Sequence, residues 1–352
     1  MTESTSITTN SDIDEPIKSS VMEDDRYINS FNPKFFAPEK LKAFRWLFSK
    51  NHTNLPTNPE ELNETLPIIE HKREEILKKS PSLRFLWIGH ASCLVQIDNF
   101  VFLTDPVFSE RCGVTPQIGQ KRYRPPALTV EDLPKELEAI FISHNHFDHL
   151  DLPSVRSLNE HYGDKLTWFC GLGGRQWFRD CFIKNVIELD WWQEWKHPTK
   201  EHIQIAFCPA QHWSRRGLND LNRSLWGGYA IWNENYRFYF AGDTGYTDNI
   251  PIFRQIGKKY GPFDLSAIPI GAYEPRWMME DQHVSPDEAV QIHIDTRSKK
   301  SIGIHWGTWA LANEFYLEPR EKLKTAVEFN RLNPNAFVVI KHGEIFDLPE
   351  SS

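Results

Sequence analysis

Short apolar runs separated by polar turns dominate the chain from Leu83 onward. The segments RFLWIGHASCLVQID and NFVFLTDP predict two strands joined by a turn at Asp98 and Asn99. Further runs of strand length lie at 139–142, 167–169, 203–207, 229–232, 238–241, 265–270, 302–304 and 337–340. Between them, helical spacing of apolar side chains predicts helices over 285–294 and 319–330. Because no internal repeat or obvious linker interrupts this pattern, it predicts one continuous domain of strands and helices.

The N-terminal part of the chain has a different pattern. Residues 1–38 are rich in Ser, Thr, Asp and Glu, which predicts a disordered polar tail. Residues 39–50, EKLKAFRWLFSK, carry Leu41, Phe44, Leu47 and Phe48 at helical spacing. Such an amphipathic helix can dock on the core or lie on a membrane surface. We therefore expect a domain at 39–352 in which residues 39–80 form a helical extension.

Charge and cysteine content exclude several classes of protein. The net charge of -8 argues against a general nucleic-acid-binding protein, since affinity for phosphates needs clustered Lys and Arg. The five cysteines are odd in number and form no C-x-x-C pair, which suits a reducing compartment. Neither an apolar signal segment nor an apolar run of about 18 residues occurs, so we expect no signal peptide and no transmembrane helix. The expected location is therefore intracellular and cytoplasmic.

Four of the apolar runs end in side chains that commonly bind metals. The run at 139–142 leads into the segment HNHFDH, which contains His144, His146, Asp148 and His149. The runs at 203–207, 238–241 and 302–304 are followed by His212, Asp243 and His305. A strand holds such a side chain rigidly, and the loop beyond it is accessible. Four such endings predict neighbouring strands that converge on one edge of a sheet.

The residue types indicate which metals this edge would hold. Imidazole and carboxylate favour zinc, manganese or iron, while the absence of cysteine ligands argues against a structural zinc site. Five imidazoles and two carboxylates exceed the needs of one tetrahedral ion but suffice for two ions about 3.5–4 Å apart. The alternatives are that single histidines such as His305 are capped or surface residues, and that Asp243 is an ordinary turn residue. All of these alternatives would have to hold together to remove the site.

The segment HNHFDH matches the H-x-H-x-D-H signature of the metallo-β-lactamase superfamily, and His212, Asp243 and His305 follow in the superfamily's order. This resemblance implies an α+β fold, the αββα sandwich, in which two mixed sheets are flanked by helices and the metal site lies at the sheet edge. It also implies a first metal on His144, His146 and His212, a second on Asp148, His149 and His305, and Asp243 as the bridge.

Longer segments, among them TDPVFSERC, PAQHWSRRGLND and IHWGTWAL, resemble the N-acylphosphatidylethanolamine-hydrolysing phospholipase D family over roughly 38–347. The resemblance implies two Zn²⁺ per chain, a homodimer, and peripheral association with a membrane lipid surface. It implies hydrolysis of N-acylphosphatidylethanolamine to phosphatidic acid and an N-acylethanolamine by a metal-bridging hydroxide. The motif H-x-K-x-x-x-x-D is missing, so such an activity would be driven by metal rather than by a phospho-histidine.

The same resemblance suggests residues around the metals. Asp243 and Asp148 would be catalytic as ligands, and Asp148 free of metal would be a candidate general base. His283 would contact phosphate or assist the leaving group, although it could instead pack beside the helix start at Ser285. Gln282 accompanies His283, and Gln117 matches a headgroup position, whereas Ile118 replaces the family's aromatic residue. Arg215 and Arg216, next to His212, could attract lipid phosphates.

Two other functions fit the same residues. One is a lactonase or phosphodiesterase of this fold that acts on a soluble metabolite. The other is a non-catalytic lipid-binding relative that retains a metal site. The nucleophile motif G-x-S-x-G and the phosphate loop G-x-x-x-x-G-K-[ST] are both missing, and Gly171 to Gly174 are interpreted as a turn.

Overall fold

The computed structural model describes residues 19–32, 34–35, 55–56, 58–71, 73–76, 78, 82–115, 117–248 and 250–348. The amphipathic segment expected at 39–50 lies outside these residues. Within them, the expected helical extension contains two short helices, α2 (Pro59–Thr65) and α3 (Arg73–Ile76). No described helix is both long enough and apolar enough to cross a bilayer.

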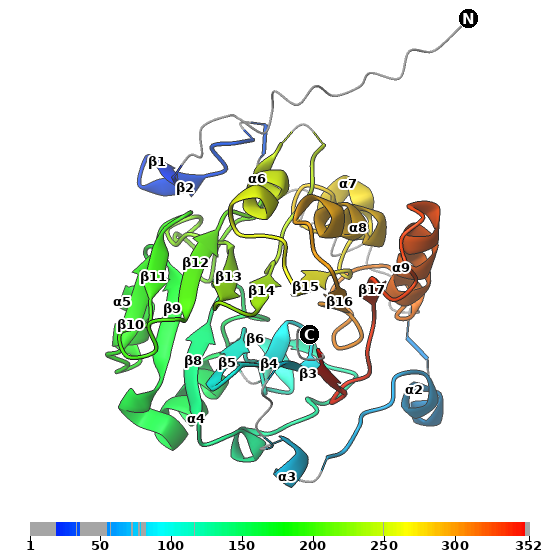
Figure 1. Ribbon diagram of the computed structural model, residues 1–352, viewed down its shortest axis with the longest axis horizontal. Coiled ribbons are helices and arrows are strands. Elements are labelled where there is room, and N and C mark those ends of the chain that lie inside the picture. Colours follow the sequence, from blue (N-terminus) through cyan, green and yellow to red (C-terminus); the bar gives the residue numbers. More distant parts are fainter. Residues whose placement is uncertain are drawn as a thin grey trace, which may run out of the picture.

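Two mixed sheets of seven strands each form the centre of the molecule (Figure 1). In spatial order, the first sheet contains β10 (Val186–Leu189), β9 (Thr167–Gly171), β8 (Leu137–Phe141), β5 (Phe100–Thr104), β4 (Ser92–Ile97), β3 (Leu83–Gly89) and β18 (Ile345–Asp347). The second contains β11 (Glu194–Lys196), β12 (Gln204–Cys208), β13 (Gly228–Trp232), β14 (Arg237–Phe240), β15 (Leu265–Pro269), β16 (Ser301–Ile304) and β17 (Phe337–Val338). Short hairpins are formed by β1 (Val21–Glu23) with β2 (Arg26–Ile28), and by β6 (Arg111–Thr115) with β7 (Ile118–Lys121).

The central strands β4, β5, β13 and β15 are buried on both faces, which explains why they read as continuous apolar runs. In β3, Phe85 and Trp87 belong to the core shared with the second sheet, whereas Leu86 and Ile88 belong to the cluster on the other face of their sheet. Side chains alternate between the two faces of a strand, so one run serves two cores. Burial of each such side chain stabilises the fold by about 1.5–3 kcal/mol.

Helices cover the outer faces of the sheets. The first sheet is covered by α4 (Leu152–Tyr162) and α5 (Arg175–Asp180), and the second by α6 (Ile252–Lys259), α8 (Pro286–Asp295) and α9 (Glu318–Phe329), as Figure 1 shows. A further short helix is α7 (Arg276–Met279). A capping box between Ser285 and Glu288 starts α8, with Pro286 in its first turn. The αββα architecture expected from the sequence is thereby confirmed.

The polar N-terminal segment contains structure that its composition did not predict. Residues 21–28, expected in a disordered tail, form the β1–β2 hairpin. Tyr27 is buried and donates its backbone N–H to the carbonyl of Asn222, and the amide of Asn29 donates to the carbonyl of His212. A few specific contacts to the domain therefore order a segment that lacks a core of its own.

Candidate metal centre

The expected metal ligands come from strand ends that meet at one edge of the sandwich. Strands β5 and β8 run parallel in the first sheet, and β14, β15 and β16 run parallel in the second. The segment 142–151 links β8 to α4, whose first turn is capped by Asp151. Within this link the backbone N–H groups of His149 and Leu150 donate to the carbonyl of His146, which holds the histidines in a tight turn. The strand ends thus deliver all seven predicted ligands to one place.

Three histidines form the first group. His146 Nδ1 lies 2.8 Å from His144 Nε2 and 3.2 Å from His212 Nε2. His212 Nδ1 donates to the carbonyl of Gln282 at 3.0 Å, and His144 Nδ1 lies 2.9 Å from Ser143 Oγ. These outer bonds orient the two rings so that each Nε2 faces its partners. An ion between them would meet three imidazole nitrogens, a ligand type that zinc and related divalent metals prefer.

Asp148, His149 and His305 form the second group. Asp148 Oδ2 lies 3.3 Å from His149 Nε2 and 3.5 Å from His305 Nε2, and the two imidazole nitrogens are 3.2 Å apart. Donor atoms on a tetrahedral zinc with bonds of about 2.0–2.1 Å lie about 3.3 Å from one another. The spacing of these three atoms therefore fits a single ion of that size.

Asp243 lies between the two groups. Its Oδ2 is 3.1 Å from His149 Nε2 and 3.9 Å from His144 Nε2, while its Oδ1 is 3.1 Å from His305 Nε2. The preceding Gly242 has φ +64 and approaches the first sheet so closely that a Cβ would lie 2.7 Å from the Cβ of Ser143. Only glycine allows both this backbone conformation and this contact. The carboxylate is thereby brought within reach of both groups.

Burial and neighbouring charges separate the pKa values of the two groups. Burial lowers the pKa of His146 to about 4 and that of His212 to about 3, so both are neutral with a free lone pair at pH 7. Burial also opposes charge on His305, but Asp243 and Asp148 outweigh it and raise the pKa of His305 to about 9. The same competition raises the pKa of His149 well above its usual value. Despite burial, these imidazoles hold the pKa of Asp243 well below the usual range.

The donor set fits two divalent ions. Asp243 Oδ1 is buried, and its close polar neighbour, His305 Nε2 at 3.1 Å, is itself a candidate ligand. The three neutral imidazoles of the first group point nitrogens at one another, and His212, whose Nδ1 donates to Gln282, presents a lone pair on Nε2 that can bind a cation. Buried His and Asp clusters of this kind define a site for two metals.

Two residues that the sequence reasoning missed support this site. Asp105, directly after β5, accepts hydrogen bonds from His149 Nδ1 at 2.6 Å and from the backbone N–H of Ser143 at 2.7 Å. It therefore sets the tautomer that leaves His149 Nε2 free for a metal. His90, in the turn between β3 and β4, places Nε2 3.0 Å from Asp148 Oδ2. The sequence could have indicated Asp105, because it is a carboxylate at the end of a predicted strand. It could not have indicated His90, because a histidine after a single glycine in a turn is not a pattern typical of metal sites.

The expected substrate residues fall in different places. His283 reaches the centre, with Nδ1 3.7 Å from Asp243 Oδ2. The carboxamide of Gln282 is buried and accepts a hydrogen bond from Trp213 Nε1, so this residue supports His212 and Trp213. Gln117 is exposed in the turn between β6 and β7. Arg215 donates to the carbonyls of Gly217 and Leu218 in its own loop.

Arg216 has a structural role that distinguishes it from its neighbour. Its Nη1 donates to the carbonyls of Asn145 and Leu150, at the two ends of the loop 145–150, here called the histidine loop. Its guanidinium also lies 4.3 Å from the ring centre of Phe147 and 5.1 Å from that of Trp177. The guanidinium thus holds the loop closed rather than facing solvent as a free cation.

Replacing Arg216 by Lys should therefore weaken metal binding by on the order of tenfold, because an ammonium group lacks the planar guanidinium that packs on Phe147 and Trp177 while its Nη1 bonds both carbonyls. Competition with a zinc-binding dye would measure the change. Arg215→Lys is the matched control and should leave the affinity unchanged. Equal affinities for Arg216→Lys and the unmodified chain would contradict the loop-closing role.

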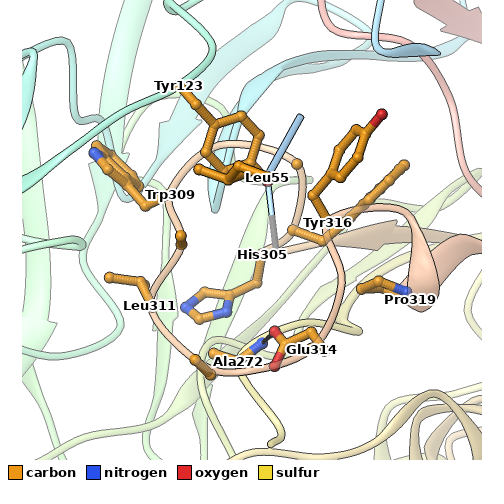
Figure 2. Close-up of a pocket in the computed structure, with 13 residues that line it drawn as sticks. Leu55, Tyr123, Ala272, His305, Trp309, Leu311, Glu314, Tyr316 and Pro319 are labelled. Atoms are coloured by element: carbon orange, nitrogen blue, oxygen red, sulfur yellow. Dashed lines mark hydrogen bonds between the residues drawn. The ribbon is translucent and has the colours of Figure 1, made fainter. Parts of the chain in front are cut away.

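His305 also lines a pocket whose other residues belong to neither metal group. Figure 2 shows His305 with Leu311 and Ala272 nearby and with three aromatic side chains, Tyr123, Trp309 and Tyr316, around the same pocket. The carboxylate of Glu314 also lines it and accepts a hydrogen bond from the backbone N–H of Ala272. The pocket therefore places these three aromatic rings and one carboxylate beside a metal ligand.

Comparison with known proteins places this site in a family. The beta-lactamase superfamily domain matches residues 101–306. The fold resembles the metallo hydrolase Igni18 from Ignicoccus hospitalis, with a TM-score of 0.56 and 19% identity over 76% of this chain and 100% of that one. It also resembles an isothiocyanate hydrolase from Delia radicum gut bacteria, with a TM-score of 0.58 and 15% identity over 75% of this chain and 99% of that one. The protein is thus a metal-dependent hydrolase of the metallo-β-lactamase fold.

Curated relatives define the family more narrowly. The chain is 41% identical over 330 residues to N-acyl-phosphatidylethanolamine-hydrolyzing phospholipase D 1 of Caenorhabditis elegans, covering 90% of this chain and 91% of the relative. It is 33% identical to the mitochondrial phospholipase D of the same name from Saccharomyces cerevisiae, over 69% of this chain and 51% of the yeast protein. The chain belongs to the N-acylphosphatidylethanolamine-hydrolysing phospholipase D family.

Proposed function

We propose that this protein hydrolyses N-acylphosphatidylethanolamine to phosphatidic acid and an N-acylethanolamine, with zinc in both metal positions. The observation that supports it most strongly is the Asp243 carboxylate between two buried groups of donors, in a chain 41% identical to a relative named for this reaction. Imidazole and carboxylate ligands suit zinc, and paired ions suit the displacement of a phosphoryl oxygen.

In this reaction water adds to phosphorus, the bond from phosphorus to the N-acylethanolamine oxygen breaks, and that oxygen takes a proton. When bound, two metal ions acidify water and neutralise charge on phosphoryl oxygens. The chain would hold them with His144, His146 and His212 on one side and Asp148, His149 and His305 on the other, with Asp243 between. Asp105 keeps His149 in the tautomer that this arrangement needs.

His283 is the residue we assign to the phosphodiester. Its Nδ1 is buried, and the described residues give it no hydrogen-bond partner, although it lies close to Asp243. Burial lowers the pKa of His283 to about 3, so the ring is neutral at pH 7. A neutral imidazole can donate one hydrogen bond to a phosphoryl oxygen or to the leaving oxygen. Gln117 and Arg215 are proposed as contacts farther out, where a lipid headgroup would enter.

The lipid substrate also suggests how the protein meets its surroundings. We propose that the pocket of Figure 2 takes apolar chain beside His305, since aromatic side chains line it. The protein would then work as an intracellular homodimer bound peripherally to a membrane lipid surface, as the family resemblance implies.

The test is mass-spectrometric detection of both products from N-acylphosphatidylethanolamine vesicles, with and without a chelator and with zinc restored. In ¹⁸O-water, the label should enter the phosphate of phosphatidic acid and not the N-acylethanolamine, because water attacks phosphorus. A protein carrying two zinc ions that turns over a soluble phosphodiester or lactone but releases neither lipid product would overturn the proposal.

A further inference from the structure

His90 occupies an irregular position in the sheet next to the metal centre. The pairing of β3 with β4 shifts its register between Trp87 and Gly89, and His90 follows with φ +53. Bulges of this kind re-aim a side chain and occur frequently beside active sites. The ring is only 2% exposed, so its polar atoms must find partners inside the protein.

The backbone of His90 is bonded to the segment that carries His305. Its N–H donates to Thr308 Oγ1 at 2.9 Å, and its carbonyl accepts the backbone N–H of His305 at 2.9 Å. The same carbonyl accepts a hydrogen bond from Trp87 Nε1 at 2.8 Å. The turn is therefore fixed from both sides, and any movement of it would be transmitted to His305.

The ring of His90 contacts two members of the second metal group. Its Nε2 lies 3.0 Å from Asp148 Oδ2, and because a carboxylate only accepts, Nε2 must carry the proton. Its centroid lies 4.0 Å from that of His305, and Trp309 packs edge-on against it at 4.7 Å. One side chain thus restrains both the carboxylate and the imidazole that would hold the second ion.

We propose that His90 is a positioning residue that fixes Asp148 and His305 for the second metal, an inference that rests on the proposed ligand set. The main competing role is that of a ligand. However, the carboxylate between the two metal groups, Asp243, lies within 3.9 Å of five other histidines, and His90 is not one of them. Among the described residues, His90 pairs with the carboxylate of Asp148 instead. A nitrogen that donates to Asp148 has no lone pair for a metal.

Three substitutions at His90 test this role through zinc binding rather than through activity. His90→Leu keeps volume but removes the donor, and His90→Asn tolerates the left-handed backbone but is too short to reach Asp148. His90→Gln places an amide N–H near the original Nε2. In chelator competition followed by metal analysis, the Leu and Asn variants should keep the first zinc and bind the second about 10- to 100-fold more weakly. The Gln variant should recover most of that affinity.

His293→Leu is the matched control, because His293 is also buried and bonded to one side chain, Ser301, away from the centre. It should keep both zinc ions. Unchanged second-site affinity in His90→Leu or in His90→Asn would overturn the proposal. A folded His90→Gln as defective as the other two would also overturn it, because the ring itself would then be a ligand. Absence of lipid hydrolysis by the zinc-loaded native chain would instead overturn only the proposed function.

Discussion

Asp243→Asn is expected to lower turnover of the phosphodiester by at least about 1,000-fold and to reduce bound zinc below two ions per chain. Replacing a residue that only hydrogen-bonds to a metal ligand already lowers metal affinity or activity by about 10- to 100-fold. The effect should be larger for Asp243, because its carboxylate faces both groups of ligands directly. The amide keeps the shape but lacks the charge that offsets two cations. It also removes the negative charge that raises the pKa of His305.

The measurements for this variant are steady-state hydrolysis and metal content on the same preparation. Asp295→Asn is the matched control, since Asp295 is a buried aspartate at the C-terminal end of α8 that accepts hydrogen bonds from Tyr246 and Gln291. It should retain turnover within a few-fold. Full turnover with two ions in Asp243→Asn would remove the basis for a bridging carboxylate.

The site could be predicted from sequence largely because its ligands follow strands. His212, Asp243 and His305 each come shortly after an apolar run, and the observed β12, β14 and β16 end four, three and one residues before them, respectively. Parallel strands bring such ends to one edge, so a linear pattern becomes a cluster in space. The strands expected at 139–142 and 265–270 likewise correspond to β8 and β15, with boundaries displaced by one or two residues.

What the sequence did not show depends on contacts between distant segments. Arg215 and Arg216 are adjacent and chemically identical, yet only Arg216 is bonded to both ends of the histidine loop. His90 and Asp148 are 58 residues apart and meet only because a bulge turns the β3–β4 connection inward. The β1–β2 hairpin is ordered by Tyr27 and Asn29 against the loop around His212, which its polar composition does not reveal. Tertiary approach, rather than local pattern, determines each of these.

Zinc uptake by the second group should depend strongly on pH, whereas uptake by the first group should not. Asp243 and Asp148 raise the pKa of His305 from 6.5 to about 9 in the metal-free chain, so below that pH zinc must displace a proton from His305. The affinity should therefore fall as pH falls from about 9, by at least about 300-fold at pH 6.5, since each pH unit below the pKa of His305 contributes tenfold and the raised pKa of His149 adds a second proton to displace. In the first group the pKa of His146 is lowered to about 4 and that of His212 to about 3, so no proton competes above pH 6.5.

Titrating chelator-treated protein with zinc and a competing dye, at about pH 9 and at pH 6.5, separates the two sites, and the first site serves as the internal control. Equal pH dependence of both sites would show that the carboxylates do not hold a proton on His305, and the assignment of Asp148 and Asp243 as its neighbours in the working protein would then fail.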